Sequence, residues 1–360
     1  MVMNDVYKRL AKKLDDLPNG FPATESGVEL KLLEKIFTPE EAEMVLKMRP
    51  MPETVEAVAE RLGKPVDEMQ AILDNMVKKG HIGSFKMFGQ QMYMLFPFVV
   101  GIYEFQLKRI DKELAALFEE YAPDLIRKVG NFEPAVARVV PVSTEIKQDL
   151  RVHRFEDAAR MLEEAKSFIV RECICRKEQA LEGHQCKHTL EACLAFSAEE
   201  NAFDRYPTGR ILNKEEALKV MKDAEEEGLV HCTYNIESGQ VFLCNCCSCC
   251  CGILRGVKQF NAPYILAKSN FVAAIDMDTC AACGVCADER CPMDAIIEED
   301  GSYRVLAERC IGCGVCAPTC PTESIKLERR PEAEQTQPPA NLMVWGMKRA
   351  AERGIEITLD

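Results

Sequence analysis

All 19 cysteines of this 360-residue chain lie between Cys173 and Cys320, a window of 148 residues. Such a density in a folded domain indicates disulfides or bound metal. Residues 1–17 alternate charged and apolar side chains and lack the apolar core of a secretory signal. The longest apolar stretch, Tyr93–Tyr103, is interrupted by Pro97 and Gly101 and is shorter than the ~20 residues of a membrane span. We therefore expect a cytoplasmic, reducing setting, where cysteine clusters more often bind metal.

Charge and missing motifs exclude several functions. The formal net charge is −13, from 45 basic and 58 acidic residues, so a nucleic-acid backbone is not expected as the main partner. No G-x-G-x-x-G follows a strand and no G-x-x-x-x-G-K-[ST] occurs, so the sequence has no NAD, flavin or ATP motif. Chemistry with those cofactors would have to reside in a partner protein.

Residues 1–125 contain no cysteine and are expected to form a winged-helix-like helical domain. Apolar spacing predicts helices over 39–48, 52–62 and 66–79, followed by a hairpin over 82–96. This order of elements is that of a winged-helix unit. The region carries 16 Lys and Arg residues against 21 Asp and Glu residues. Because DNA contacts need a basic footprint on the phosphates, we expect protein docking rather than DNA binding.

The whole chain is expected to be an α+β multidomain protein. A long helix over Tyr103–Tyr121 is expected to end before Pro123. In the Cys-rich α/β middle domain we expect a helix over Phe155–Lys166, a strand over Ser167–Glu172, a helix over Lys214–Glu227 and a hairpin over 229–244. The expected boundaries after the first domain are a linker with one short strand at 126–150, the middle domain at 151–268, a two-cluster ferredoxin domain at 269–328, and a tether and tail at 329–360, where Trp345 is either an anchor or exposed.

A duplicated motif lies in the third of these regions. The first copy contains Cys280, Cys283, Cys286 and Cys291, and the second contains Cys310, Cys313, Cys316 and Cys320. The second copy reads C-x2-C-x2-C-x3-C-P, the run found in bacterial ferredoxins. Three thiolates from one tight loop can reach three corners of a cubane, and Gly284 and Gly314 permit the close turn. Zinc ligands normally come as separated pairs instead.

This region resembles the two-cluster bacterial-type ferredoxins over about 55 residues. The resemblance implies two 4Fe-4S clusters in which the fourth cysteine of each copy serves the other cluster. One cluster would use Cys280, Cys283, Cys286 and Cys320, and the other would use Cys310, Cys313, Cys316 and Cys291. The first copy has four residues, 287–290, before its last cysteine instead of three. This insertion is expected to alter one cluster potential and not cluster binding.

The middle region holds the remaining cysteines. Cys173, Cys175, Cys186 and Cys193 form one group, and Cys244, Cys246, Cys247, Cys249, Cys250 and Cys251 form a dense run. Neighbouring side chains on an extended chain point to opposite faces, so one cubane cannot take every thiol of the run. Either two metal centres flank the run, or some thiols are spare, or the cluster is not a simple cubane. Cys232 is expected to be an ordinary core thiol.

One or two further iron–sulfur clusters are expected on these ten cysteines, because soft thiolate sites accept iron. A zinc site is the alternative, formed by the first four middle cysteines or by Cys186 with His184 and His188. Basic residues near the runs are expected to stabilise negative clusters, and binding of an anionic substrate is the alternative. These basic residues are Arg176, Arg255 and Lys258.

The chain as a whole resembles a family of 4Fe-4S binding proteins from anaerobes, over residues 20–328. The resemblance rests on E-C-I-C-R at Glu172–Arg176, on Leu229–His231, on C-N-C-C-x-C-C-C-G at Cys244–Gly252 and on the ferredoxin repeat. It implies redox work with other anaerobic oxidoreductases. Cys250-Cys251-Gly252 is also similar to segments of heterodisulfide reductase catalytic subunits, where vicinal thiolates bind non-cubane clusters.

The leading hypothesis is therefore an iron–sulfur electron-transfer protein or oxidoreductase subunit, rather than a stand-alone enzyme, that passes electrons to a redox partner of an anaerobic system. One alternative is a reductase with a substrate-binding iron–sulfur centre at the middle cysteines. A second alternative is a redox-sensing DNA-binding regulator that uses the winged-helix-like region.

Overall fold

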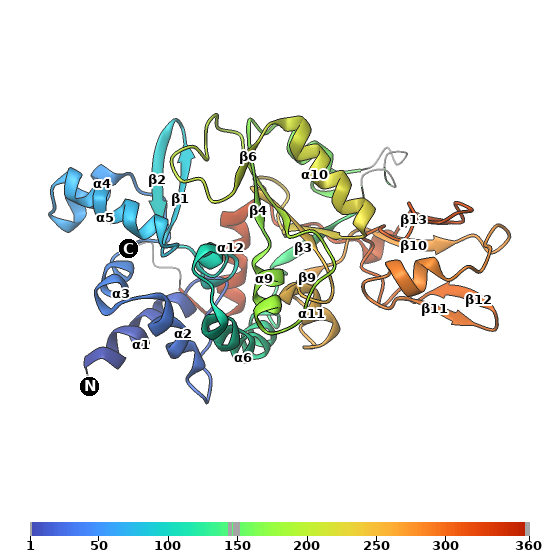
Figure 1. The fold of residues 1–360 in the computed structure, drawn as a ribbon, viewed down its shortest axis with the longest axis horizontal. Coiled ribbons are helices and arrows are strands. Elements are labelled where there is room, and N and C mark those ends of the chain that lie inside the picture. Colours follow the sequence, from blue (N-terminus) through green and yellow to red (C-terminus); the bar gives the residue numbers. More distant parts are fainter. Residues whose placement is uncertain (1, 143–145, 147–151, 357–360) are drawn as a thin grey trace.

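The computed structural model describes residues 2–142, 146 and 152–356. The molecule is elongated, with a helical N-terminal region at one end, a seven-stranded sheet in the middle and a small lobe of two-stranded sheets at the other end (Figure 1). The predicted α+β character is confirmed. Most of the second half of the predicted linker, including the expected start of the middle domain at 151, lies outside the described residues.

The N-terminal region contains helices followed by a hairpin, in the predicted order. Its elements are α1 (Val2–Asp15), α2 (Val28–Ile36), α3 (Pro39–Leu46), α4 (Val55–Leu62), α5 (Val66–Lys78), β1 (Gly83–Met87) and β2 (Gln90–Met94). Phe88 and Gly89 join the strands with φ values of 51° and 77°, the left-handed pair typical of a two-residue hairpin turn. The helix, turn, helix and hairpin order is thus present, and the winged-helix description remains a prediction.

The helix predicted over Tyr103–Tyr121 is wrong at both ends. An irregular turn with non-helical backbone at 99–101, η1 (Phe98–Ile102), and a 3-10 helix, η2 (Glu104–Lys108), come first, and α6 runs from Lys112 to Val129. Asp111 sets the start, because its carboxylate accepts a hydrogen bond from the Leu114 amide at 2.9 Å and caps the helix. Pro123 lies inside α6 and does not end it, since the helix buries Leu125 and Ile126 beyond it.

The middle of the molecule is one mixed sheet with strand order β6-β4-β5-β8-β7-β3-β9, in which only β3 and β9 are parallel. Helices α8 and α10 cover one face, and α6, α9 and α11 pack over the cysteine-bearing face. The elements are β3 (Ala137–Val140), η3 (Arg154–Glu156), α8 (Ala158–Glu163), β4 (Ser167–Glu172), α9 (Ile174–Leu181), β5 (Glu191–Ser197), β6 (Arg210–Leu212), α10 (Lys214–Glu227), β7 (Val230–Tyr234), β8 (Phe242–Cys246), α11 (Gly252–Lys258) and β9 (Leu266–Ala267).

Several local predictions for this region are confirmed, and one is corrected. The strand Ser167–Glu172 and the helix Lys214–Glu227 have the predicted bounds, and Gly228 ends the helix with φ 80°. The helix expected over 155–166 is shorter, because the Asp157 side chain caps α8 and separates it from η3. The strand expected in the linker is β3, and the structure places it between β7 and β9 inside the sheet.

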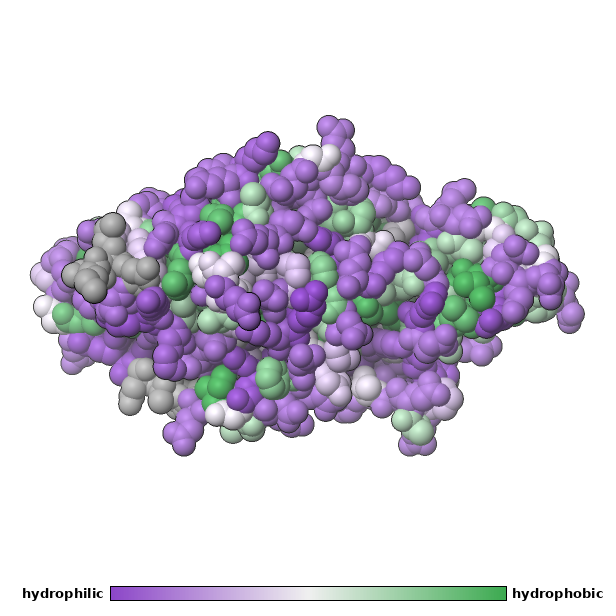
Figure 2. Space-filling model, turned by 90° about the horizontal axis from the view of Figure 1, so that it is seen from below, coloured by the Kyte–Doolittle hydropathy of each residue, from purple (hydrophilic) through white to green (hydrophobic). Residues whose placement is uncertain are grey.

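The C-terminal lobe carries the ferredoxin repeat on two short antiparallel pairs. They are β10 (Phe271–Ile275) with β13 (Ile325–Arg329) and β11 (Ile296–Glu299) with β12 (Ser302–Val305), and η4 (Cys286–Arg290) lies between them. Figure 2 shows this lobe as the narrower end at the right, where hydrophobic side chains lie among hydrophilic ones. No helix among the described residues is both long enough and apolar enough to cross a bilayer.

The segment after the lobe packs against the molecule instead of forming the mobile tether that we expected. Arg330 is buried and donates to the Cys310 carbonyl at 2.7 Å. The Glu237 amide donates to the Pro339 carbonyl at 2.8 Å. A final helix, α12 (Leu342–Glu352), follows η5 (Glu332–Glu334) and buries Trp345, whose indole N–H donates to the Ala135 carbonyl at 2.9 Å. Trp345 is therefore the anchor of the tail.

Candidate metal centres

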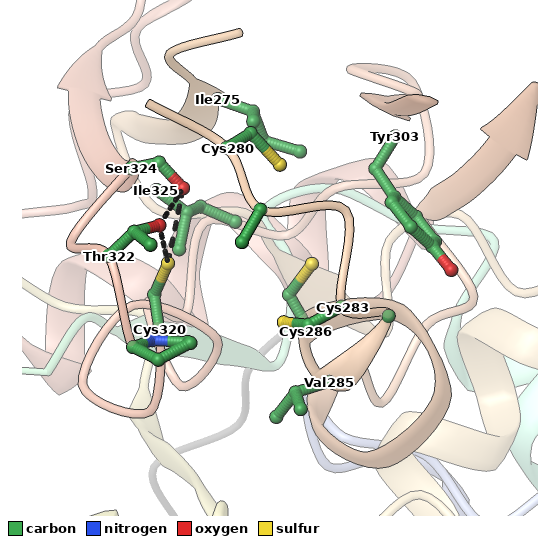
Figure 3. Close-up of a pocket in the computed structure, with 13 residues that line it drawn as sticks. Ile275, Cys280, Cys283, Val285, Cys286, Tyr303, Cys320, Thr322, Ser324 and Ile325 are labelled. Atoms are coloured by element: carbon green, nitrogen blue, oxygen red, sulfur yellow. Dashed lines mark hydrogen bonds between the residues drawn. The ribbon is translucent and has the colours of Figure 1, made fainter. Parts of the chain in front are cut away.

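The first candidate centre is an exposed four-cysteine pocket at the tip of the ferredoxin lobe. Its volume is about 330 Å³, and Figure 3 shows the four thiols around it. The thiols belong to Cys280, Cys283, Cys286 and Cys320. Cys283 is exposed, so this centre lies close to solvent. Gly284 has φ 79°, and a Cβ there would lie 2.8 Å from the Tyr303 hydroxyl, so the loop requires glycine.

The second candidate centre is a pocket of about 330 Å³ deeper in the same lobe. Its cysteines are Cys291, Cys310, Cys313 and Cys316. The last three of these are buried, and burial raises the pKa of Cys313 to about 12. Each pocket therefore combines three cysteines of one copy with the fourth cysteine of the other, which is the interleaving that the ferredoxin resemblance implies.

The two pockets differ at the fourth cysteine. The Cys320 sulfur lies 3.2 Å from the Ser324 hydroxyl and 3.7 Å from the Thr322 hydroxyl, as the dashed lines of Figure 3 show. Burial raises the pKa of this thiol, but hydrogen bonds from the Ser324 side chain, from Thr322 and from the Ile325 backbone amide outweigh burial and lower the pKa to about 6. In the other copy, the Cys291 sulfur accepts from the Ala295 amide at 3.2 Å. The position equivalent to Ser324 is thus an alanine without a hydroxyl.

The third candidate centre is a compact group of four thiols in the middle region, formed by Cys186, Cys247, Cys249 and Cys250. Their sulfurs all lie within 4.8 Å of one another, and the neighbouring pairs are 3.6–3.7 Å apart. A tetrahedral ion with metal–sulfur bonds of ~2.3 Å places its thiolates ~3.8 Å apart. The geometry therefore fits a single tetrahedral ion bound directly by four thiolates.

This grouping differs from both zinc alternatives that the sequence suggested. Cys186 lies with the dense run and not with the other three cysteines of the first middle group. His184 is exposed, and the His188 ring lies 3.5 Å from the Glu227 carboxylate. A hydrogen bond from the Cys250 thiol and the charge of Arg176 lower the pKa of Cys247 to about 5. The site thus favours a thiolate at Cys247.

The other middle cysteines form a closed ring of contacts on the sheet. Cys173 contacts Cys175 and Cys193, Cys244 contacts Cys193 and Cys246, and Cys251 contacts Cys175 and Cys246. Each of these six thiols thus has two neighbours within the set, which we call the six-thiol ring, and Cys246 also contacts Cys232. Hydrogen bonds from Cys193 and Cys246 lower the pKa of Cys244 to about 5.

The fold explains which thiols enter the ring. Cys193, Cys244 and Cys232 lie opposite one another across β5, β8 and β7, so their side chains share one face of the sheet. Cys173 precedes α9 and Cys251 precedes α11, and both helices lie over this face. In the dense run, Cys246 and Cys251 turn to the ring, while the three cysteines between them turn to the four-thiol group. Of the three alternatives left open for the run, two centres that flank it is the one that matches this partition of the thiols.

Cys232 is a buried core thiol on a strand, as predicted, and it also has a thiol neighbour. It is buried on β7 and contacts the Cys246 thiol of the ring. It also lies within electrostatic range of Cys313 in the buried ferredoxin pocket. The only sequence signal was its place on a predicted strand, and the register that sets it opposite Cys244 is visible only in the sheet.

The nearby basic residues have different partners. Arg176 is 2% exposed, donates to the carbonyls of Asn245 and Thr189 at 2.9 and 2.6 Å, and lies near thiols of both middle groups. Arg255 pairs with Glu119, and Lys258 lies 2.6 Å from Asp294. Of these three residues, Arg176 therefore has the most thiol neighbours, and Arg255 also lies within electrostatic range of Cys175.

Comparisons with known proteins match the ferredoxin lobe. The 4Fe-4S binding domain family matches residues 303–326. Over 96 residues, the chain is 28% identical to the electron transport protein HydN of Escherichia coli K12, covering 24% of this chain and 55% of HydN. It is 50% identical over 42 residues to the uncharacterized ferredoxin MJ0155 of Methanocaldococcus jannaschii, covering 12% of this chain and 28% of that protein. Ferredoxin-1 of Caulobacter vibrioides is 39% identical over 46 residues, covering 13% of this chain and 41% of that ferredoxin.

The chain thus spans about half or less of the length of these relatives. No solved structure matches it. The fold, the paired pockets and the family match together define an iron–sulfur protein with a ferredoxin-type 4Fe-4S domain near its C-terminus. A separate cysteine cluster in the middle of the chain can hold a further metal centre.

Proposed function

We propose that this chain is an electron-transfer protein that relays electrons through two ferredoxin-type 4Fe-4S clusters to a redox protein of an anaerobic oxidoreductase system. The exposed cluster would use Cys280, Cys283, Cys286 and Cys320, and the buried cluster would use Cys310, Cys313, Cys316 and Cys291. The observation that carries the proposal is the pair of similar pockets, each lined by four cysteines drawn from both copies of the repeat. The clusters supply the one-electron chemistry, and the chain sets potentials through burial and hydrogen bonds to sulfur.

We expect the redox partner to dock at the exposed pocket. Cys283 is exposed there, and Met277 beside it is 50% exposed. Residues 269–328 carry 4 Lys and Arg residues against 11 Asp and Glu residues, so more than half of the net charge of −13 lies in this lobe. Opposite charge accelerates encounter between proteins. We therefore expect the partner to present a basic surface.

The four-thiol group would add a single tetrahedral ion, either zinc or iron, bound by Cys186, Cys247, Cys249 and Cys250. The support is the thiol spacing of 3.6–3.7 Å, which leaves no room for the sulfides that a cubane places between its thiolates. A zinc ion there would be structural, because zinc has no redox chemistry. Iron in the same geometry would add a redox centre.

The test is metal and sulfide analysis of anaerobically purified protein, with electron paramagnetic resonance of the reduced form. Two 4Fe-4S clusters require about eight iron and eight sulfide per chain. Cys320→Ala should degrade the signal of the exposed cluster, and Cys291→Ala should degrade the signal of the buried one. Ser302→Ala, an exposed substitution in the same lobe, is the matched control. Fewer than about eight sulfides in the wild type, or no reversible reduction, would refute the proposal.

The two other hypotheses from the sequence make different predictions. A reductase with an open iron site would show spectra that change when a thiol or disulfide substrate is added. A regulator would bind DNA with a strong dependence on salt and redox state. The acidic first turn of α5, with Asp67 and Glu68, does not favour the regulator.

A further inference from the structure

The six-thiol ring is a ligand set that neither the ferredoxin repeat nor the four-thiol group uses. We propose that it binds a polynuclear iron centre, in which at least two irons are joined through bridging thiolates or sulfides. The inference that the ring binds metal depends on the ring geometry alone. The inference that this metal carries electrons depends on the proposed electron-transfer function. The ring members are Cys173, Cys175, Cys193, Cys244, Cys246 and Cys251.

The number of ligands argues against a mononuclear site. One tetrahedral ion takes four thiolates, and one cubane also takes four. Two tetrahedral ions need about eight bonds, which six thiolates supply when two of them bridge. Every ring thiol contacts two other ring thiols. The contacts therefore do not divide the ring into four thiols that bind one metal centre and two thiols that bind none. The closed ring therefore fits a centre with shared ligands.

The surroundings of the ring also favour metal over inert thiols. Cys173, Cys246 and Cys251 are buried, and the other three are only partly accessible. The buried Arg176 lies beside Cys173 and Cys246, and its Nε has no hydrogen-bond partner among the described residues. A buried guanidinium needs a negative partner, and a thiolate-bound iron centre carries negative charge. Arg176 also faces Cys247, so its charge is shared between the ring and the four-thiol group.

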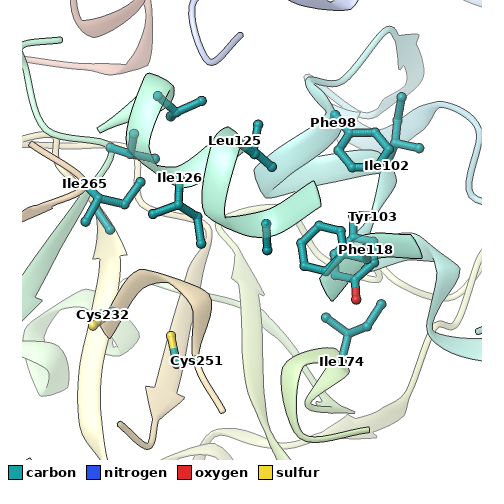
Figure 4. Close-up of a cluster of buried hydrophobic side chains, with 14 of the residues drawn as sticks. Phe98, Ile102, Tyr103, Phe118, Leu125, Ile126, Ile174, Cys232, Cys251 and Ile265 are labelled. Carbon is teal, nitrogen blue, oxygen red and sulfur yellow. The ribbon is translucent and has the colours of Figure 1, made fainter. Parts of the chain in front are cut away.

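The position of the ring favours iron over zinc. On one side, Cys232 contacts the ring at Cys246 and lies within electrostatic range of Cys313 of the buried ferredoxin pocket. Figure 4 shows Cys232 and Cys251 on neighbouring elements below Ile126 of α6. On the other side, Cys175 packs against a small buried cluster that includes Cys247 and Cys250 of the four-thiol group. A redox-active ring would extend the relay from the ferredoxin lobe into the sheet.

The experiment compares metal content per chain in the full-length protein purified without oxygen. Cys173→Ala and Cys246→Ala should each lose at least two irons, while the signals of both ferredoxin clusters persist. Cys249→Ala should lose one metal ion and leave the ring iron in place. Val230→Ala is the packing control, because it removes buried volume from β7 on the same face as Cys232 and should keep all metal. Mössbauer spectroscopy of the wild type should show irons beyond the ferredoxin pair.

Four results would overturn the inference. The ring variants could retain all iron, lose only one iron, or lose zinc instead of iron. Alternatively, alkylation of the denatured wild-type protein could reveal disulfides among the ring cysteines. Acid-labile sulfide lost together with the iron identifies a sulfide-containing cluster, and loss of iron alone identifies a purely thiolate-bridged one; both support the proposal. If the ferredoxin signals are absent from the wild type, the proposed function fails, and the ring is still tested by the metal count.

Discussion

Removing the Ser324 hydroxyl should lower the potential of the exposed ferredoxin cluster. Ser324 is 4% exposed, and its hydroxyl lies 3.2 Å from the Cys320 sulfur. The Thr322 hydroxyl donates to the Ser324 oxygen at 3.1 Å, so Ser324 is free to donate its own proton to sulfur. Reduction adds negative charge to the cluster, and a donor to sulfur stabilises the reduced form more than the oxidised form. The Ser324→Ala substitution removes that preference.

The expected shift follows from the strength of one hydrogen bond. A bond to a charged acceptor contributes ~1.5 kcal/mol or somewhat more to stability. Both oxidation states keep a thiolate at Cys320, so only the difference between them counts, which we take as about a third to a half of that value, ~0.5–0.7 kcal/mol. For one electron, ~1.4 kcal/mol corresponds to ~59 mV. We therefore expect the potential of the exposed cluster to fall by ~20–30 mV.

The assay is a potentiometric titration followed by electron paramagnetic resonance, which separates the two clusters by their signals. The reciprocal substitution Ala295→Ser places a hydroxyl near Cys291 and should raise the potential of the buried cluster. Ser302→Ala, exposed on β12, is the matched control and should move neither potential. An unchanged potential in Ser324→Ala, or a shift confined to the buried cluster, would refute both the hydrogen-bond argument and the placement of Cys320 in the exposed centre.

Three further predictions concern stability and docking. Trp345→Ala should lower the free energy of unfolding, measured in urea, by ~3–5 kcal/mol, because the indole is 2% exposed. The control Met347→Ala, at a side chain that is 59% exposed, should change this free energy by less than ~0.5 kcal/mol. Equal effects of the two substitutions would contradict the anchoring of the tail by Trp345. Burial lowers the pKa of His81 from 6.5 to about 4, so the neutral ring stabilises the fold above pH 6.5, and up to ~3 kcal/mol is lost as the pH falls toward 4. The His81→Gln variant should therefore show a flatter dependence of unfolding on pH, and an identical dependence would exclude this source. Asp278→Lys, beside the exposed pocket, should slow the reduction of a cationic cobalt complex by the protein at low salt. Asp204→Lys, exposed in the middle region, makes the same change of charge and should slow this reduction less. A larger effect of Asp204→Lys would place the electron exit elsewhere.

Local signals predicted the elements whose ends are set by neighbouring residues. Asn213 and Glu216 form a capping box at the start of α10, and Gly228 ends the helix in the left-handed region, so both bounds followed from the sequence. The prediction failed at α6, where Pro123 suggested an end. A proline inside a helix removes one hydrogen bond and crowds the carbonyl four residues before it, and the packing of Leu125 and Ile126 outweighs that cost. The cap at Asp111 was the stronger signal.

The same contrast separates the ferredoxin pockets from the six-thiol ring. Three ligands of each ferredoxin pocket come from one loop, so their spacing shows in a motif. The ring draws its thiols from α9, β5, β8 and the start of α11, and these elements meet only because the strands pair in one register. A shift of that register by one residue would turn Cys193 and Cys244 to the opposite face. Alternation along the dense run excluded one cubane that takes every thiol, and the grouping of Cys186 and Cys232 depended on tertiary contacts.

Cys232 is an example of a thiol whose neighbours become visible only in the tertiary structure. By spacing it belongs to no motif, and as a single buried thiol on a strand it has the features of an ordinary core residue. In the sheet it lies opposite Cys244 and faces the ring, while the buried ferredoxin pocket lies on its other side. With Cys232 included, every one of the 19 cysteines has another cysteine as a neighbour in one of four groups. Cys232 is therefore a core thiol that contacts the six-thiol ring and lies within electrostatic range of Cys313 in the buried ferredoxin pocket.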